Sequence, residues 1–211
     1  MSLDHPRIVL LYQSLLGIYG DHGNAVVCQK RLQWRGLDAE LLTIEPGEPV
    51  PTDADLYLLG GGEDTAQITA VRQLKADGGL FTALDRGAVL FAVCAGYQIC
   101  GSSFTIGAHD EIIEGLGLLD VQTRRGPQRA VGEVLHHWTR PDGTESLVTG
   151  FENHGGWTTL GTDATALADV EIGWGNGDRT TEGAIQGNVI GTYPHGPVSY
   201  THLRAHETSL H

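Results

Sequence analysis

Cysteine, basic residues and long apolar runs are all scarce in this sequence. Its three cysteines, Cys28, Cys94 and Cys100, are an odd number and form no CxxC pair, which argues against a disulfide framework and against a zinc ribbon. Lys and Arg together number 13 against 26 Asp and Glu, a formal net charge of −13. Such a chain repels nucleic acid phosphates and anionic lipid head groups. We therefore expect neither of these partners, and at least one thiol is free for chemistry.

The sequence also lacks the features of a secretory signal and of a membrane span. The N-terminal residues include Asp4 and Pro6 where a signal peptide has basic side chains. The apolar run at 8–11 is too short to cross a bilayer. These absences predict a soluble, cytoplasmic protein without membrane insertion.

The length and composition are typical of a single folded domain. The chain has 211 residues, 40% of them hydrophobic and 18% charged, with 30 glycines against 8 prolines. This is a globular composition with many tight turns. The last residues, 198–211, lack apolar periodicity and resemble a translated vector or adaptor. We predict one domain over residues 1–197 and a non-native or disordered tail over 198–211.

The first half of the chain alternates between apolar runs and helical segments. One helix is capped by Asn24 and stopped by Gly36, another covers about 66–77, and a short apolar helix follows Cys94. The runs at 7–12 and 88–93 have the composition of buried strands, and two further short apolar runs lie between them at 39–44 and 56–59. This alternation predicts an α/β fold with a doubly wound, largely parallel sheet flanked by helices. Ligands then bind at the C-terminal ends of its strands.

The pattern changes after Leu116. Strand-like pieces separated by Gly, Asp and Thr take the place of helices, at 118–123, 130–135, 147–151 and 184–193. These pieces predict an antiparallel extension in the second half of the same domain.

The strongest local signal surrounds Cys94. The sequence Ala92-Val93-Cys94-Ala95-Gly96 follows an apolar run and precedes a helical one, which is the pattern of a nucleophile elbow with small residues two places before and after the nucleophile. A helix N-terminus lowers the pKa of a thiol there, and the amide of Ala95 can receive an oxyanion. The alternative is a buried cysteine acting as a small hydrophobe. Cys28 and Cys100 lack these flanks and are interpreted as core or helix-face residues.

The glycine run at 60–62 follows another apolar run. Backbone without side chains can approach a tetrahedral intermediate closely, so Gly61 and Gly62 are candidates for a second oxyanion donor. A phosphate-binding loop is the alternative. The Gly-Lys-Ser/Thr ending is absent, however, and Glu63 and Asp64 would repel phosphate.

A thiol nucleophile needs a base, and His195 is the leading candidate. It closes the segment 188–196, an apolar strand followed by a Pro/Gly turn, which would bring an imidazole to a strand end beside the elbow. His154 is the competing candidate. Three other histidines are interpreted as surface turn residues: His5, His109 and His136.

Together these motifs resemble the class I glutamine amidotransferases, in their cobyric acid synthase-like branch, over residues 7–197. The resemblance implies a flavodoxin-like fold. It rests on four segments: Cys94-Ala95-Gly96-Tyr97-Gln98, the glycines at 60–62, Gly-Phe-Glu-Asn-His-Gly-Gly at 150–156 and Tyr-Pro-His-Gly at 193–196. Within the branch, the run at 151–156 and the stand-alone length resemble the glutaminase subunits of lipid II isoglutaminyl synthase.

The resemblance also implies roles for several residues. Class I triads end in His-Pro-Glu, whereas this chain has His195-Gly196-Pro197, so a Cys–His dyad is implied. Arg129 stands where the family carries an arginine for the α-carboxylate of glutamine, with Arg124 and Arg125 as alternatives. Gln98 is a second substrate-binding candidate, and Asn153 and His154 are candidate wall residues of the site.

The implied activity is hydrolysis of glutamine to glutamate and ammonia through a cysteinyl thioester. The implied partner is a Mur ligase-like, ATP-dependent subunit of the MurT type, in a heterodimer, which uses the ammonia to amidate the α-carboxyl of D-glutamate in lipid II. Neither a cofactor nor a metal is expected in this chain, because Walker sequences and metal-ligand clusters are absent from it. The alternatives are a stand-alone cysteine hydrolase, a glutaminase serving another synthase such as a cobalamin-type one, and a non-catalytic docking subunit.

Overall fold

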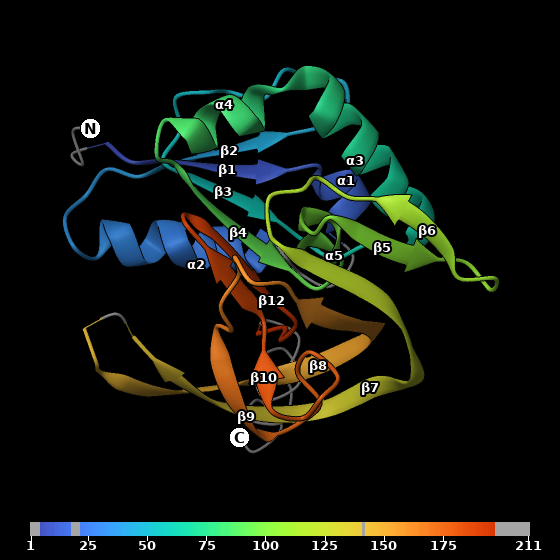
Figure 1. Cartoon of the computed structure of the whole chain (residues 1–211). Helices are drawn as coiled ribbons and strands as arrows, with labels where there is room; N and C mark the ends of the chain where they lie inside the picture. The colour runs from blue at the N-terminus through green and yellow to red at the C-terminus, as the bar shows by residue number, and fades with distance from the viewer. Residues whose placement is uncertain (1–4, 18–21, 141, 197–211) are drawn as a thin grey trace, which may run out of the picture.

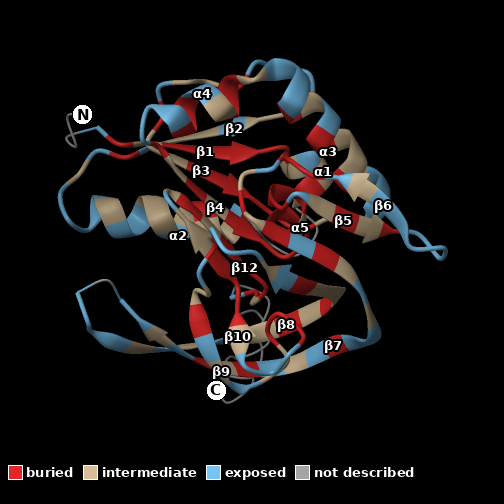
Figure 2. Cartoon of the chain, in the orientation of Figure 1, coloured by how far each residue is buried: buried red, intermediate tan, exposed pale blue. Residues whose placement is uncertain are grey.

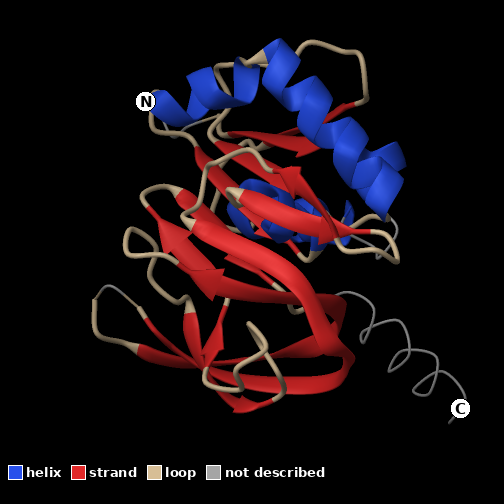
Figure 3. Cartoon of the chain, turned by 45° about the vertical axis from the view of Figure 1, so that its right-hand side comes forward, coloured by secondary structure: helices blue, strands red, loops and turns tan. Residues whose placement is uncertain are grey.

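The computed structural model describes residues 5–17, 22–140 and 142–196, which form two six-stranded sheets (Figure 1). The first sheet carries the helices, and the second lies below it (Figure 3). The predicted tail at 198–211 lies outside the described residues. No helix in the described part of the chain is long and apolar enough to cross a membrane.

The first sheet has the strand order β11-β12-β4-β3-β1-β2. All neighbouring pairs are parallel except β11 with β12. The parallel strands therefore follow the flavodoxin-like order of a doubly wound sheet. The strands are β1 (Arg7–Leu11), β2 (Glu40–Ile44), β3 (Leu56–Leu59), β4 (Val89–Val93), β11 (Ala184–Gln186) and β12 (Val189–Thr192).

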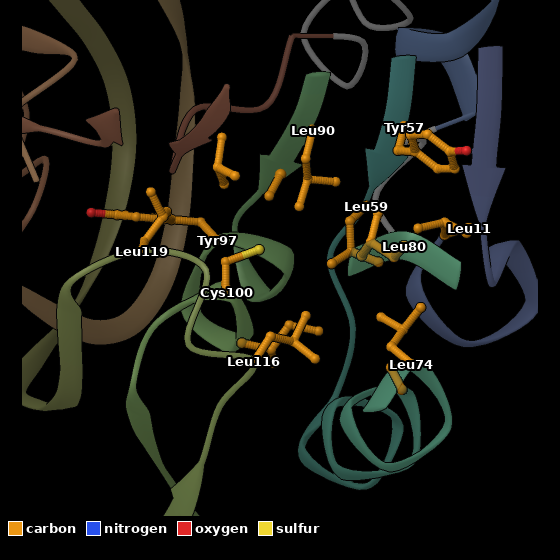
Figure 4. Packing of buried hydrophobic residues seen from close by; sticks show 14 of the residues in the cluster. Leu11, Tyr57, Leu59, Leu74, Leu80, Leu90, Tyr97, Cys100, Leu116 and Leu119 are labelled. Carbon is orange, nitrogen blue, oxygen red and sulfur yellow. The ribbon is translucent and has the colours of Figure 1, made fainter. Parts of the chain in front are cut away.

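Helices cover both faces of this sheet, because its central strands are apolar on both sides. In β1, Ile8 and Leu10 pack with α2, while Val9 and Leu11 belong to the larger core beneath α3 and α4. Figure 2 shows β1 largely buried, and Figure 4 shows Leu11 on the same side as Leu74 and Leu80. The helices are α1 (Gln13–Leu16), α2 (His22–Gln33), α3 (Asp64–Asp77), α4 (Gly79–Asp85) and α5 (Ala95–Cys100).

The second sheet is mostly antiparallel and is built around one long hairpin. Strands β7 and β8 pair from Val121 with Leu160 to Thr139 with Glu145, and the register shifts between Arg125 and Ala130. Its strands are β5 (Ser103–Ile106), β6 (Glu111–Glu114), β7 (Val121–Thr139), β8 (Glu145–Leu160), β9 (Ala168–Ile172) and β10 (Thr181–Glu182).

The predicted α/β fold is confirmed, and most of the differences concern the second half. The antiparallel strands form a separate sheet, and the pieces predicted at 118–123 and 130–135 fall on the single strand β7. The piece predicted at 184–193 is the hairpin β11–β12, since Gly187 has φ 58° and supports a two-residue turn. In the first half, helices α1 and α4 were not predicted, and α2 begins at His22, so Asn24 lies inside the helix rather than at its cap.

One histidine interpretation is wrong. His136 lies inside β7 and is fully buried rather than in a surface turn. Side chains alternate along a strand, and His136 shares its inward face with Val134, which is also buried. The interpretation of the other two cysteines holds: Cys100 is buried and Cys28 is half-buried on α2.

Candidate active site

Cys94 lies at the sharp turn between β4 and α5. Its backbone has φ 54° and ψ −111°, and a positive φ is uncommon for a residue other than glycine. The turn is held on both sides: Cys94 N donates to Thr192 O at 2.8 Å, and Gln98 N donates to Cys94 O at 3.1 Å. The structure thus contains the strand-to-helix turn that the motif predicts.

The flanking small residues make this turn possible. A Cβ on Gly96 would lie 2.4 Å from Leu59 O and 2.9 Å from Gly60 O, so a side chain there would push the turn away from β3. Ala92, on the other flank, is completely buried. The requirement for small residues therefore comes from backbone that approaches the elbow closely.

A cavity of about 180 Å³ opens beside Cys94, which lines it although the residue is only 6% exposed. Two of the three oxyanion candidates, Ala95 and Gly62, also line this cavity, as does Gln98. Gly61, the other candidate, is buried and does not belong to the lining. We call this the front cavity.

His195 follows the neighbouring strand β12 and is buried, but it does not belong to the lining of the front cavity. It comes three residues after Thr192, which pairs with Val93 in the sheet, and its backbone exchanges hydrogen bonds with Phe151 at 2.8 and 3.1 Å. Burial, together with the charge of nearby His154, lowers the pKa of His195 to about 4. The imidazole is therefore neutral near pH 7, which is the form that accepts a proton.

His154 is arranged differently from His195. Its ring stacks on Tyr193 with 3.6 Å between centroids, and its Nδ1 lies 2.8 Å from Gly156 O, so Nδ1 donates to that carbonyl. Its Nε2 lies 3.6 Å from Glu152 Oε2. Nδ1 is therefore engaged, whereas Nε2 is buried without a hydrogen-bond partner among the described residues. His154 lines the front cavity, and we interpret it as a wall residue of that cavity.

The three candidate arginines differ in whether they line the front cavity and in their bonding partners. Arg129 lines the front cavity, donates from Nε to Asn153 Oδ1 at 2.7 Å and has no ion-pair partner among residues 5–17, 22–140 and 142–196. Arg125 also lines it, but pairs with Asp110 at 2.5 Å. Arg124 donates to Ser103 Oγ at 2.9 Å and lies outside the lining. Arg129 is thus the most available of the three for an anionic group.

The sequence matches the protein family of CobB/CobQ-like glutamine amidotransferase domains over residues 7–202. The chain belongs to this family. The amidotransferase is 33% identical to "Lipid II isoglutaminyl synthase (glutamine-hydrolyzing) subunit GatD" of Staphylococcus aureus, over 87% of this chain and 74% of that protein. It is 30% identical to the GatD subunit of Streptococcus pneumoniae, over 91% of this chain and 74% of that protein.

Another relative is considerably longer than the region it shares. A cobyric acid synthase of Sphingopyxis alaskensis is 39% identical over 79% of this chain, which spans only 33% of that protein. Among solved structures, one described as a glutamine amidotransferase covers 95% of both chains with a TM-score of 0.56 and 18% identity. That likeness concerns the fold, and it agrees with the sheet predicted from the sequence. The family confirms the predicted enzyme class.

Several site residues of the amidotransferase were not predicted from the sequence. Asp64, Gln67 and Thr105 line the front cavity, and no motif marks them. Behind the wall, Glu152 accepts hydrogen bonds from Trp174 N and Gly175 N at 2.9 and 3.1 Å. Glu152 and Tyr193 belong to the motifs at 150–156 and 193–196. Membership of these motifs was the one signal in the sequence that could have marked them as site residues.

Proposed function

We propose that this amidotransferase hydrolyses L-glutamine with Cys94 as nucleophile and His195 as base. The observation that carries the proposal is the backbone of Cys94, a positive-φ residue at a strand-to-helix turn that also lines a cavity. Such strained geometry persists when the surrounding structure enforces it, and it is concentrated at functional sites. The adjacent strand end supplies the only histidine of the 193–196 motif.

The chemical steps follow from these positions. His195 takes the thiol proton, and the Cys94 sulfur forms a bond to the side-chain amide carbon of glutamine. The amides of Ala95 and of Gly61 or Gly62 receive the negative oxygen of the tetrahedral intermediate. His195 then protonates the leaving nitrogen, the C–N bond breaks and ammonia departs. Water attacks the thioester, which releases glutamate and restores the thiol.

The charges around the front cavity suit the two ends of an amino acid. Arg129 is the proposed partner of the α-carboxylate, because a guanidinium fork binds a carboxylate through two hydrogen bonds. Glu63 and Asp64 also line the front cavity and suit the α-ammonium. Gln98, whose Nε2 lies 3.4 Å from Tyr193 Oη, is the proposed contact nearest the elbow, with Asn153 orienting Arg129.

The wider role that we propose is the supply of ammonia to a Mur ligase-like partner. That subunit would use ATP to amidate the α-carboxyl of D-glutamate in lipid II, in the cytoplasm, as part of peptidoglycan synthesis. Two relatives named as GatD subunits, each matched over 74% of its length, support this assignment. The second candidate, a cobalamin-type amidotransferase, is supported by the 39% identity to a cobyric acid synthase.

The test of the chemistry is ammonia release from glutamine by the wild type and Cys94→Ala. We expect the variant to lose at least about a thousandfold of the rate, and Cys28→Ala, at a half-buried site on α2, to keep it. Each protein is assayed alone and with the Mur ligase-like subunit. Equal rates for wild type and Cys94→Ala would exclude Cys94 as the nucleophile, and lipid II amidation in the paired assay separates the two wider roles.

A further inference from the structure

A second cavity, of about 330 Å³, lies on the other side of the strand pair β4–β12. Val93 and Thr192 line it, whereas Cys94, the next residue after Val93, lines the front cavity. We call it the rear cavity. Its volume is in the range of small-molecule sites, and it shares no lining residue with the front cavity.

The rear cavity is mostly apolar. Phe91, Ile190 and Leu167 contribute aliphatic and aromatic surface, and Trp138 and Val148 add to it from the second sheet. No Lys or Arg belongs to the described lining. The lining therefore suits an apolar ligand body. Because the lining has no basic side chain, a positive charge in this cavity would have to be carried by the ligand.

Glu182 is an acidic group in this lining and is only 1% exposed. Its Oε1 accepts hydrogen bonds from Thr192 Oγ1 at 2.8 Å and from Tyr193 N at 2.7 Å. Its Oε2 accepts none from the described residues. Burial raises the pKa of Glu182 to about 7, as expected of a carboxylate that lacks a cationic partner.

His136 is a second buried polar group in the lining and has no exposed surface. Neither ring nitrogen makes a hydrogen bond of normal geometry in the described part of the chain, although a weaker interaction with the backbone of Leu135 raises the pKa of His136 against the effect of burial. Burial lowers its pKa, so the ring is neutral near pH 7 and offers one donor and one acceptor. Each unsatisfied buried group destabilises a protein, and native structures nearly always provide a partner.

We propose that the rear cavity binds a small molecule with an apolar body and a single ammonium group, which the unpartnered Oε2 of Glu182 holds by a hydrogen bond. The ammonium supplies both the N–H donors and the positive charge that the lining lacks. Alkyl or aryl amines of fewer than about ten heavy atoms match the available volume. This site is independent of the glutamine chemistry, and its test does not use activity.

The experiment is a titration of the full chain with benzylamine and with benzyl alcohol, followed by ligand-observed NMR and calorimetry. The two probes share a ring and differ in the charge of the head group. We expect saturable binding of one benzylamine, at least about tenfold tighter than benzyl alcohol, because a hydrogen bond to a charged partner is about twice as strong as a neutral one. Equal affinities, or no saturation in the millimolar range, would overturn the proposal and leave water as the occupant.

Variants localise the binding. Val148→Trp fills the rear cavity from β8 and is expected to abolish saturable benzylamine binding. Leu147→Trp adds the same ring at the adjacent position, which is 63% exposed and outside the lining, so it is the matched control. Glu182→Gln is expected to weaken benzylamine by about tenfold and benzyl alcohol by less than threefold. Unchanged benzylamine binding in Val148→Trp would place the ligand elsewhere, and circular dichroism verifies folding.

Discussion

The two sheets contribute different kinds of group to the front cavity. Cys94, Ala95 and Gly62 follow strands of the first sheet, while Arg129 and the segment 153–156 come from β7 and β8 of the second. The proposed base His195 also follows a strand of the first sheet, although it lies outside the lining. In the proposed reaction the first sheet carries the atoms that make and break bonds, and the second holds the substrate. We therefore expect substitutions in the first sheet to change the rate of the chemical step, and substitutions in the second sheet to change the affinity for glutamine.

The geometry of each sheet explains this division. Neighbouring parallel strands end side by side, so Cys94 and Thr192 are joined by a backbone hydrogen bond of 2.8 Å, which fixes the reacting groups within a narrow range of positions. The second sheet reaches the cavity through an irregularity in β7 between Arg125 and Ala130. A bulge redirects side chains, and here it carries Arg129 to the cavity while leaving β7 paired on either side.

The largest expected effect is on the first sheet. His195→Ala removes the proposed base, and we expect kcat for glutamine hydrolysis to fall by about a thousandfold, with KM changed by less than threefold. Steady-state ammonia release measures both constants. His137→Ala, at a half-exposed histidine paired with Glu171, is the control and should behave as the wild type. A thousandfold rise in KM with an unchanged kcat would contradict the proposal that the first sheet carries the reacting groups.

Glu182 lies on β10 of the second sheet and accepts a hydrogen bond from Thr192 on β12 of the first. Its substitution tests this contact between the sheets. Burial raises the pKa of Glu182 from 4.5 to about 7. Between these pH values the native state binds more protons than the unfolded state, so protonated Glu182 contributes to stability at low pH, and this contribution is lost as the pH rises through 7. Glu182→Gln lacks this titration. Each pKa unit corresponds to about 1.4 kcal/mol, so we expect the variant to gain on the order of 3 kcal/mol relative to wild type between pH 5 and pH 8.

Urea unfolding at the two pH values measures this gain. Glu114→Gln is the control, since the hydrogen bond from Lys75 lowers the pKa of exposed Glu114 and the carboxylate therefore stays ionised throughout the window. A Glu182→Gln curve parallel to that of the wild type would mean that Glu182 is ionised in the native protein at both pH values.

Arg129 tests the second sheet. Arg129→Ala removes the proposed carboxylate contact, and we expect KM for glutamine to rise by roughly ten- to a hundredfold while kcat changes by less than threefold. Arg124→Ala is the matched control on the same strand, because Arg124 bonds Ser103 outside the cavity. If kcat fell and KM stayed constant, Arg129 would have to act in the transition state. The assignment of substrate binding to the second sheet would then be wrong.

Local patterns predicted the first sheet better than the second for a physical reason. Strands buried on both faces are continuous apolar runs, and the elbow at Cys94 is encoded by its immediate neighbours. In contrast, Gly126, Gly132 and Gly150 interrupt the long hairpin strands in sequence without ending them in space. Glu152 and Glu182 could not be predicted as buried, since the amides that bond them, such as Trp174 N and Tyr193 N, come from distant residues or from another strand.

The smallest expected effect concerns His154, and it sharpens the comparison most. His154→Phe keeps an aromatic ring for the stack on Tyr193 but removes both nitrogens, while Glu152 retains its bonds from Trp174 N and Gly175 N. If His154 is a wall residue, kcat should fall by less than about tenfold, and KM should rise by a similar small factor. His154→Ala, which also removes the stack, should cause the larger loss of the two. A thousandfold fall in kcat for His154→Phe would instead make His154 the base, and would move a reacting group from the first sheet to the second.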